Sequence, residues 1–458
     1  MCKTRYGGAK PVKVTESKVF YRNFNKRLST IVRGKGIYLY DKDGRKYIDA
    51  CSGSVSANLG HGNEEIAETM GKQAATLAYT HMHSFTNEQA EQLARRVVEY
   101  SGQDYEAVYF VSGGSEATDT AVKLARQYYL ERDGRSCKHK VISRWMSFHG
   151  NTVGAMSVSG KRGLRQKYDP YLFDSPHIEA PYCYRCPYDR SYPQCGLRCA
   201  QELENCILRE GPENVSAFMA EPIGGTSLSA LRPPDDYYRA VREICDRYDV
   251  LLIFDEVMTG FGRTGRHFAM EYFDVVPDIL TFAKGVSSCY FPLGGVMAGG
   301  RVVEAIKKGS GKFTHGYTYS GNPLACAVGN KAVEIIKRER LAENAAKQGA
   351  YIKGRLAEMA AELPVIGDIR GEGLLIGVEF VADPATKQPF PAKAGFNAKL
   401  EQAGMKLGLA LYPGGYSINE TSGDHRIISP PINITAAECQ LLMDLFQQAL
   451  AQVCHELL

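Results

Sequence analysis

The residues with the clearest chemical potential are a lysine and an aspartate that each close a short apolar run. Lys284 ends the run 278–284 and is followed at once by a glycine, and Asp255 ends the run 250–255. Runs of this length predict buried strands. A lysine amine can hold an aldehyde as a Schiff base, and a carboxylate can keep a pyridine nitrogen protonated. The pair therefore fits a pyridoxal phosphate (PLP) enzyme, although two ordinary strands with charged ends would show the same pattern.

A glycine turn upstream has the features of a phosphate site. The segment 108–126 predicts a strand, a turn at Gly113 and Gly114, and then a helix. The glycines let the backbone approach a ligand, and Ser115 can cap the helix, whose free N–H groups and dipole favour an anion. No Gly-Lys-Ser/Thr follows this turn, and the turn itself lacks the Gly-x-Gly-x-x-Gly spacing, so it is neither a P-loop nor a dinucleotide site.

Three further segments carry polar groups at predicted strand ends or in turns. Phe148 could stack on a pyridine ring and His149 could hydrogen-bond near Asp255, although both are more often structural residues. Glu221 closes another predicted strand, at the edge where open α/β sheets bind ligands. The glycine-rich segment 315–323 carries several hydroxyl groups and could offer a second phosphate contact.

Predicted strands and helices alternate through the middle of the chain. Helical patterns at 116–130 and 235–248 separate strand patterns at 107–112, 140–143, 217–221, 250–255, 279–283 and 295–298. Such alternation indicates βαβ units and a mainly parallel sheet covered on both faces. The expected fold class is α/β.

Both ends of the chain differ from this middle part. Residues 36–49 predict a hairpin with Asp-Gly at its turn. After about residue 323 come long helices at 325–338 and 342–362, short strands near 371–380 and 426–429, and a last helix at 435–455. We therefore expect a large domain over 61–322 and a smaller α+β domain built from 1–60 and 323–458.

Composition narrows the class of protein. The 458 residues carry a formal net charge of +4 with both signs spread along the chain, which does not favour nucleic acid or a membrane surface as a partner. No apolar run has the length of a spanning helix or the place of a secretory signal. Thirteen cysteines, several inside strand or helix patterns, favour a reducing compartment, so we expect a soluble cytoplasmic protein.

Four cysteines lie together in a tyrosine- and proline-rich segment at 181–199. Cys183 and Cys186 have the two-residue gap of a zinc knuckle, and Cys195 and Cys199 have a three-residue gap, so four thiolates could bind a metal or form disulfides. The composition indicates a surface-loop insertion, and a large α/β core needs no such crosslink. Packed or free thiols are favoured, and no metal site is predicted.

Taken together, these segments resemble the class III (ω-) aminotransferases of PLP fold type I. The matching stretches, in the family's order and spacing, are 112–117, 148–150, 220–222, 255–265, 283–285 and 317–321. Stretches at 58–62 and 428–432 extend the likeness over nearly the whole chain. The most specific part is Asp-Glu-Val-Met-Thr-Gly-Phe-Gly-Arg-Thr-Gly from Asp255, with Lys284 following 29 residues after that aspartate.

The resemblance implies roles for these residues. Lys284 would form the Schiff base and Asp255 would pair with the pyridine nitrogen. Phe148 would stack on the ring and Val257 would pack on its opposite face. The full set of cofactor-binding residues implied is Gly114, Ser115, Phe148, His149, Glu221, Asp255, Val257, Lys284 and Thr318.

The resemblance also implies an assembly. Thr318 would reach the phosphate held by the neighbouring subunit, so the smallest active unit would be a homodimer, alone or within a dimer of dimers. Its small-molecule partners would be an amine donor and a keto acid acceptor.

Several positions depart from the family pattern. The mobile arginine that takes the keto acid carboxylate in many members is replaced by Tyr412. Arg426 could substitute for it, although an exposed strand residue is slightly favoured. Val55 stands where a substrate-facing aromatic is common, which predicts a wider pocket. Cys289 replaces a usual glycine, and Phe148 replaces the commoner tyrosine.

These features leave three reactions open. The first, which we expect, moves nitrogen from an ω-amine or ω-amino acid to pyruvate or 2-oxoglutarate. Lys284, less charged in a buried site, would act as the base. The alternatives are an aminomutase or racemase on the same scaffold, and a decarboxylating relative.

Overall fold

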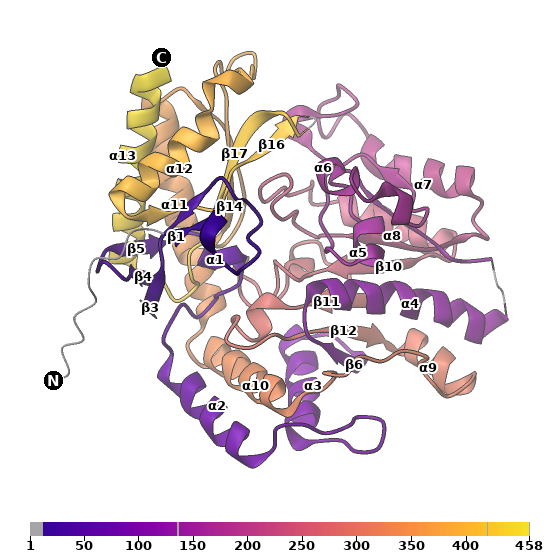
Figure 1. Ribbon diagram of the computed structural model, residues 1–458. Coiled ribbons are helices and arrows are strands. Elements are labelled where there is room, and N and C mark those ends of the chain that lie inside the picture. The colour runs from indigo at the N-terminus through magenta and orange to yellow at the C-terminus, as the bar shows by residue number, and fades with distance from the viewer. Residues whose placement is uncertain (1–11, 135–136, 419, 458) are drawn as a thin grey trace.

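A seven-stranded mixed sheet lies at the centre of the computed structural model, which describes residues 12–134, 137–418 and 420–457 (Figure 1). Of its strands, β12 alone runs opposite to the common direction of the other six. The expected α/β fold with a mainly parallel sheet is confirmed, and each predicted strand is found within a few residues of its expected limits. In sheet order the strands are β6 (Tyr105–Val111), β12 (Gly294–Gly299), β11 (Ile279–Phe282), β10 (Leu251–Asp255), β9 (Val215–Ala220), β7 (Lys140–Arg144) and β8 (His177–Ile178).

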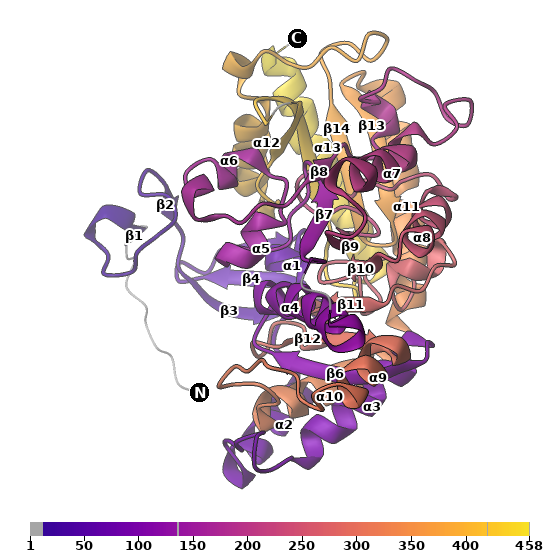
Figure 2. The same ribbon diagram turned by 90° about the vertical axis from the view of Figure 1, so that its right-hand side faces the viewer.

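Both faces of this sheet are covered by helices. Consecutive residues of β9, such as Ala217 and Phe218, belong to separate apolar clusters on opposite faces of the sheet. The whole of β9 and β10 is buried, as is typical of central parallel strands. The helices α4 (Gly114–Asp133) and α9 (Gly300–Lys308) pack on the face of Ala217, and α7 (Arg198–Glu210) and α8 (Tyr237–Arg247) pack on the other (Figure 2).

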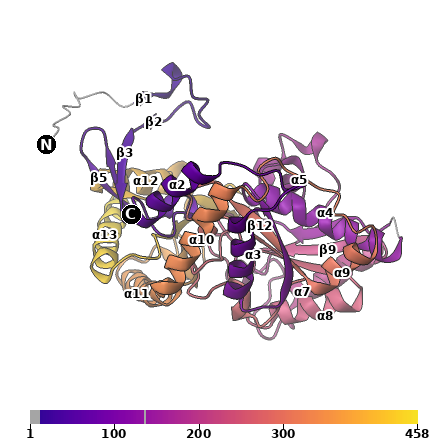
Figure 3. The ribbon, with the colours of Figure 1, turned by 90° about the horizontal axis from the view of Figure 1, so that it is seen from below.

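Three helices pack together next to β6, as seen from below in Figure 3. Each begins after an asparagine whose side chain accepts a hydrogen bond from a backbone N–H three residues further on, which satisfies a free donor of the first turn. These helices are α2 (Glu64–Thr76), α3 (Glu88–Ser101) and α10 (Pro323–Arg338), with caps Asn63, Asn87 and Asn322.

The two ends of the chain build two smaller sheets, one from both ends and one from the C-terminal part alone (Figure 1). The first has the order β15 (Leu409–Ala410), β5 (Lys46–Asp49), β4 (Tyr38–Asp41) and β3 (Ile31–Lys35), so it joins an early segment to a late one. The second has the order β13 (Ile366–Glu372), β14 (Leu375–Phe380), β17 (Ser422–Ile428) and β16 (Gly415–Ile418). The late helices are α11 (Leu341–Glu362), α12 (Phe396–Leu407) and α13 (Ala436–Leu457). The domain limits at residues 60 and 322 stay a prediction.

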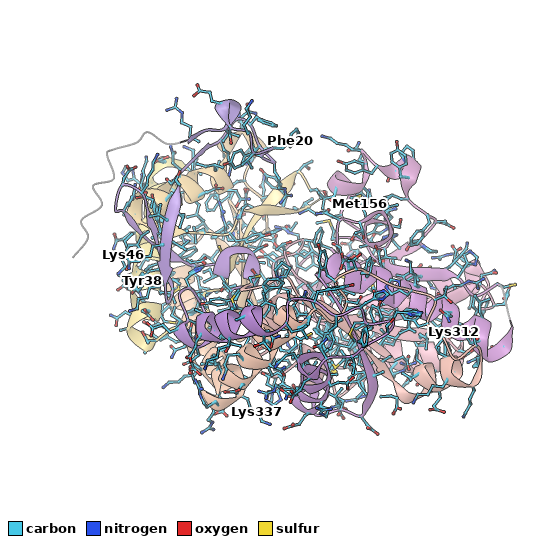
Figure 4. All side chains as sticks on the ribbon, turned by 60° about the horizontal axis from the view of Figure 1, so that its bottom comes forward. Phe20, Tyr38, Lys46, Met156, Lys312 and Lys337 are labelled. Carbon is cyan, nitrogen blue, oxygen red and sulfur yellow. The ribbon has the colours of Figure 1, made fainter. Side chains whose placement is uncertain are left out.

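The expected hairpin is formed by β4 and β5. Gly44 in its turn has a φ of +83°, which favours glycine. Lys46 of β5 lies with its Nζ 3.5 Å from the ring centroid of Tyr38 of β4, and both side chains are marked in Figure 4. This cation–π contact ties the two strands at the surface.

The remaining elements are short. The pair β1 (Val12–Lys13) and β2 (Arg27–Leu28) projects from the body in Figure 2. The short helices are Val14–Glu16, α1 (Ser52–Val55), α5 (Val153–Ser157), α6 (Arg162–Arg165), Asp169–Tyr171, Cys183–Arg185, Ala269–Tyr272, Lys284–Val286 and Ala392–Ala394. Across the described ranges, no helix combines the length and apolarity needed to cross a membrane.

Candidate active site

Five strands of the central sheet deliver their carboxyl ends to one cavity of about 160 Å³. Asp255 closes β10, Glu221 follows β9, and Lys284 follows β11. The glycine turn follows β6, and Phe148 and His149 follow β7. Because neighbouring parallel strands end at the same edge, residues more than a hundred positions apart meet there. The cavity is lined by Gly114, Ser115, Phe148, His149, Gly150, Glu221, Ile223, Thr226, Asp255, Val257, Met258 and Lys284.

Asp255 is held in place by two hydrogen bonds. His149 Nδ1 lies 2.7 Å from Asp255 Oδ2, which is the contact expected between these residues. The Val257 N–H donates to Asp255 Oδ1 at 3.0 Å. His149 is itself fixed, since Thr118 Oγ1 donates to its carbonyl at 2.7 Å. The carboxylate therefore presents a fixed negative charge to the cavity.

Lys284 faces this carboxylate from a strained backbone. Its φ of +48° is rare for a side-chain-bearing residue and is the kind of strain found at functional sites. Burial lowers the pKa of the Lys284 amine, while the charges of Asp255 and Glu221 act in the opposite direction. The next residue must be small, because a Cβ on Gly285 would lie 2.6 Å from Asn58 Nδ2. The close packing against Asn58 thus explains why a glycine follows Lys284 in the sequence.

The start of α4 lies on the cavity wall, at the place where the anion seat is expected. Its first helical residue is Gly114, and a Cβ there would lie 2.9 Å from Val257 Cγ1, so glycine is needed for the close approach. Ser115 Oγ accepts a hydrogen bond from the Asn151 N–H at 3.0 Å. The 20-residue helix directs its dipole and free N–H groups at the cavity. The expected core-facing stripe, Ala117, Ala121, Leu124 and Ala125, is buried.

Glu221 lines the cavity beside Asp255. Its Oε1 accepts a hydrogen bond from the Gly225 N–H at 2.9 Å, and its carbonyl accepts one from Arg144 Nη2 at 2.6 Å. Burial raises the pKa of the Glu221 carboxyl. This second carboxyl group adds to the polar rim around Lys284.

Thr318 is the one predicted site residue that does not line this cavity. It lies in a separate hollow of about 620 Å³, which we call the Thr318 hollow, with Tyr79, Tyr109, His315 and Ser320 on its wall. His315 Nε2 lies 2.8 Å from Thr120 Oγ1, and Ser320 Oγ donates to Tyr109 OH at 3.1 Å. These contacts fasten the segment to α4 and β6.

Of the residues thought to shape the substrate site, Arg426 differs from its expected placement. Arg426 is fully buried, and its guanidinium donates to the carbonyls of Tyr412 and Asn397, so the interpretation as an exposed strand residue is wrong. Val55 is also fully buried and does not line the cofactor cavity. Cys289 is exposed with a φ of +59°, a backbone that suits the glycine usual in the family.

Four cavity residues had no predicted role: Gly150, Ile223, Thr226 and Met258. Gly150 and Met258 lie inside the family-like stretches 148–150 and 255–265, so their place at the site could have been predicted from the neighbouring residues. Ile223 and Thr226 follow Glu221 in a loop without regular periodicity, and their direction depends on the folded loop.

The four clustered cysteines are free thiols around a cavity of only about 20 Å³. Burial raises the pKa of the Cys199 thiol to about 12, which disfavours the thiolate. Within the described part of the chain, no group of three or more His, Cys, Asp or Glu side chains is arranged to hold a metal ion.

The donor set of the main cavity fits PLP. A lysine amine with a lowered pKa, a fixed carboxylate, a helix N-terminus with a serine hydroxyl and an aromatic ring line one space. His149 Nε2 is buried without a hydrogen-bond partner among the described residues, so the imidazole has a donor or acceptor to spare there. This set can hold an aldehyde, a ring nitrogen and a phosphate at once.

Comparison with known proteins identifies the family. The model of class III aminotransferases matches residues 20–450, and the chain therefore belongs to this family. It is 36% identical to the diaminobutyrate–2-oxoglutarate transaminase of Halomonas elongata, over 93% of this chain and 91% of that protein. It is 34% identical to the putrescine–pyruvate aminotransferase of Pseudomonas aeruginosa, over 96% and 94%.

A solved structure extends the likeness to the fold. An amine transaminase from an uncultivated Pseudomonas species, in its PLP-bound form, superposes with a TM-score of 0.89 at 32% identity, covering 96% of this chain and 99% of that one. The fold is thus PLP fold type I, the protein is an aminotransferase, and its cofactor is PLP.

Proposed function

We propose that the enzyme transfers an amino group from an ω-amine or ω-amino acid to pyruvate or 2-oxoglutarate, with Lys284 and Asp255 as its catalytic residues. The observation that carries this proposal is the meeting of Lys284, with its lowered pKa, and the fixed Asp255 carboxylate in one cavity. The names of the two relatives support the substrate class, since both diaminobutyrate and putrescine carry a terminal amine.

Each residue has a stated task in this proposal. The bound cofactor supplies the electron sink. Lys284 would attach the cofactor aldehyde and, once free, would move the proton at the carbon that carries nitrogen; its lowered pKa leaves more of the basic amine. Asp255 would hold the proton on the ring nitrogen, and His149 orients Asp255. Gly114 and Ser115 would bind the phosphate, Phe148 and Val257 would cover the ring, and Glu221 completes the wall.

We also propose that Thr318 completes the phosphate site of a partner subunit in a homodimer or a dimer of dimers. The Thr318 hollow does not share a lining residue with the cofactor cavity of its own chain. Large apolar side chains on its wall are exposed, namely Tyr79 (41%) and Met82 (40%), and so is Tyr319 (64%), which follows Thr318 in the chain. An exposed apolar rim of this kind favours burial against another chain.

The cytoplasm is the proposed location. All the cysteines in the described ranges are free thiols, which supports a reducing compartment.

The decisive experiment follows the visible cofactor spectrum during each half of the reaction. We expect a panel of single amine donors, without keto acid, to convert the cofactor to its amine form and stop there. Pyruvate or 2-oxoglutarate should then restore the starting spectrum. A donor that is turned over repeatedly while the spectrum stays unchanged would instead favour the aminomutase or racemase.

A further inference from the structure

A second cavity, of about 710 Å³, lies beside the cysteine-containing insertion, and we call it the insertion cavity. Its wall includes Trp145 and Leu228 from loops after β7 and β9, Tyr184 and Arg185 from the insertion, and Ser417 and Glu420 from the C-terminal part. The same two loops, at 145–150 and 223–228, contribute Phe148 and Thr226 to the cofactor cavity. The two spaces are thus built from shared elements.

Arg185 is held on this wall by a buried carboxylate. Glu379 is 0% exposed, and its Oε1 accepts hydrogen bonds from Arg185 Nε at 2.6 Å and from Ser417 Oγ at 2.8 Å. Arg370 Nη1 donates to the other oxygen at 3.2 Å. A guanidinium fixed through one edge keeps little freedom to lose when a ligand binds.

Most donors of this guanidinium are not used within the chain. A guanidinium carries five N–H groups, and among the described residues Arg185 donates a hydrogen bond only through Nε. Its Nη2 is buried without a partner, as is the neighbouring hydroxyl of Tyr184. The Arg185 side chain is 17% exposed. Unpaired donors around a fixed cation call for an anion with two acceptor oxygens, and a carboxylate has that geometry.

The other charged groups of the cavity are less suited to define a ligand. Arg162, Arg190, Glu179 and Asp189 are exposed. Glu420 Oε2 already accepts a hydrogen bond from the Gly163 N–H at 2.7 Å, although its Oε1 has no partner among the described residues. A cationic ligand at Glu420 is therefore the competing outcome.

We propose that the insertion cavity binds an organic carboxylate through Arg185. The family's mobile arginine is replaced by Tyr412, and Arg426 is enclosed, so neither of these positions supplies an accessible guanidinium. If the bound carboxylate is the far end of the substrate, this identification of the ligand rests on the proposed function. Binding of a carboxylate to the insertion cavity does not depend on the proposed function.

The chain carries a reporter for this test. Trp145 is the only tryptophan in the sequence and lies on the cavity wall, with Arg162 Cζ 4.7 Å from its ring centroid. We expect glutarate, titrated into the holoenzyme, to change the tryptophan fluorescence saturably, with the affinity confirmed by equilibrium dialysis. We expect tetramethylammonium, a cationic probe without a transferable amino group, to leave the fluorescence unchanged. Arg185→Met should weaken glutarate binding by about tenfold or more, as expected for loss of a charge-assisted pair.

Two variants keep the test specific. Arg190→Met removes an exposed cation from the same loop and cavity and should keep the wild-type affinity. Arg185→Lys keeps the positive charge but loses the two parallel N–H donors of the guanidinium, and should give intermediate binding. This variant keeps the test valid if Arg185→Met does not fold. Borohydride labelling of Lys284 in the same preparations reports on the proposed function separately.

The outcomes are distinct. If glutarate competes with the amine donor, the carboxylate belongs to the substrate; if it binds without competing, the cavity takes a separate carboxylate ligand, and both results support the proposal. Absence of saturable glutarate binding overturns it. So does equal weakening in Arg190→Met, or saturable binding of tetramethylammonium in place of glutarate.

Discussion

The cofactor cavity and the Thr318 hollow differ in what supports and surrounds their polar groups. In the cofactor cavity, the polar groups stand at strand ends and are fixed by neighbours of the same chain, as Asp255 is by His149 and the Val257 N–H. In the Thr318 hollow, the segment is fastened through His315, but the rim is apolar and exposed. The first region is a preorganised site, whereas the second has the surface of an interface.

This difference predicts how each region should respond to mutation. Damage to the cofactor cavity should abolish chemistry within one chain. Damage to the Thr318 hollow should weaken cofactor retention in a partner chain and leave the chain's own lysine chemistry intact.

The largest effect is expected for Lys284→Ala. Without the amine, neither attachment of the cofactor nor proton transfer is available, so turnover should fall by roughly 10⁴-fold or more. Borohydride reduction of the wild type should leave the pyridoxyl mass on the Lys284 peptide. Lys161→Ala is the matched control, because burial lowers the pKa of Lys161 too; it should keep the label. Label on another lysine would contradict the assignment.

The next effect is expected for Asp255→Asn. The amide keeps the shape but loses the charge that holds the ring proton, so the barrier should rise by about 3–4 kcal/mol, as for other preorganised electrostatic groups. Steady-state rates and the cofactor spectrum measure turnover and retention, and the cofactor should stay bound. Glu221→Gln, in the same cavity, should lose less. Near-normal turnover in Asp255→Asn would remove this residue from the mechanism.

Thr318→Ala should have a smaller effect and act on cofactor affinity. Loss of one hydrogen bond to a charged group weakens binding by roughly 1.5–3 kcal/mol, which titration of the apoenzyme with PLP measures. Mixing this variant with Lys284→Ala at limiting PLP tests the shared site. One site of each heterodimer then carries both lesions and the other carries none, so activity should reappear.

The control for that mixture is Lys284→Ala with Ser115→Ala. Both of these residues serve the site of their own chain, so each site of the heterodimer keeps one lesion and activity should stay low. Equal behaviour of the two mixtures, with heterodimers proven, would show that each chain builds its own phosphate site.

The smallest effect concerns pH and the Thr318 segment. Burial lowers the pKa of His315 to about 4, from about 6.5 in an unfolded chain, with the charge of Lys123 adding to the effect. Between these pH values the open segment binds more protons than the closed one. The closed conformation of the segment is therefore most stable above about pH 6.5 and loses stability as the pH falls towards 4. Hydrogen exchange of residues 313–321, corrected for its intrinsic pH dependence, should therefore show more opening at pH 5 than at pH 7. A His315→Gln variant should lack this difference.

The fold and the cofactor cavity were largely predictable because both depend on strands. Apolar runs predicted six central strands, and parallel strands place their carboxyl ends at one edge, which brought Lys284, Asp255 and Glu221 together. The motif around Asp255 then pointed to the family that the comparison confirms.

Features that depend on loop packing were not predictable. Arg426 lies in a strand whose pattern gives no sign that its guanidinium is enclosed by backbone carbonyls. The insertion cavity needs Arg185 and Glu379, which are 194 residues apart and in no common motif. Such contacts arise from how loops dock on the sheets, and local periodicity carries no information about docking.

The helix α4 has a consequence for communication between subunits. Its first turn contains Gly114 and Ser115, the proposed phosphate seat, and its seventh residue is Thr120, which His315 contacts. One helix thus connects the residues proposed to bind the chain's own cofactor to the segment proposed to bind the cofactor of the neighbouring subunit. In such a dimer, loss of cofactor from one site would loosen the segment that contacts the cofactor of the other site. The cofactor affinities of the two sites would then be coupled.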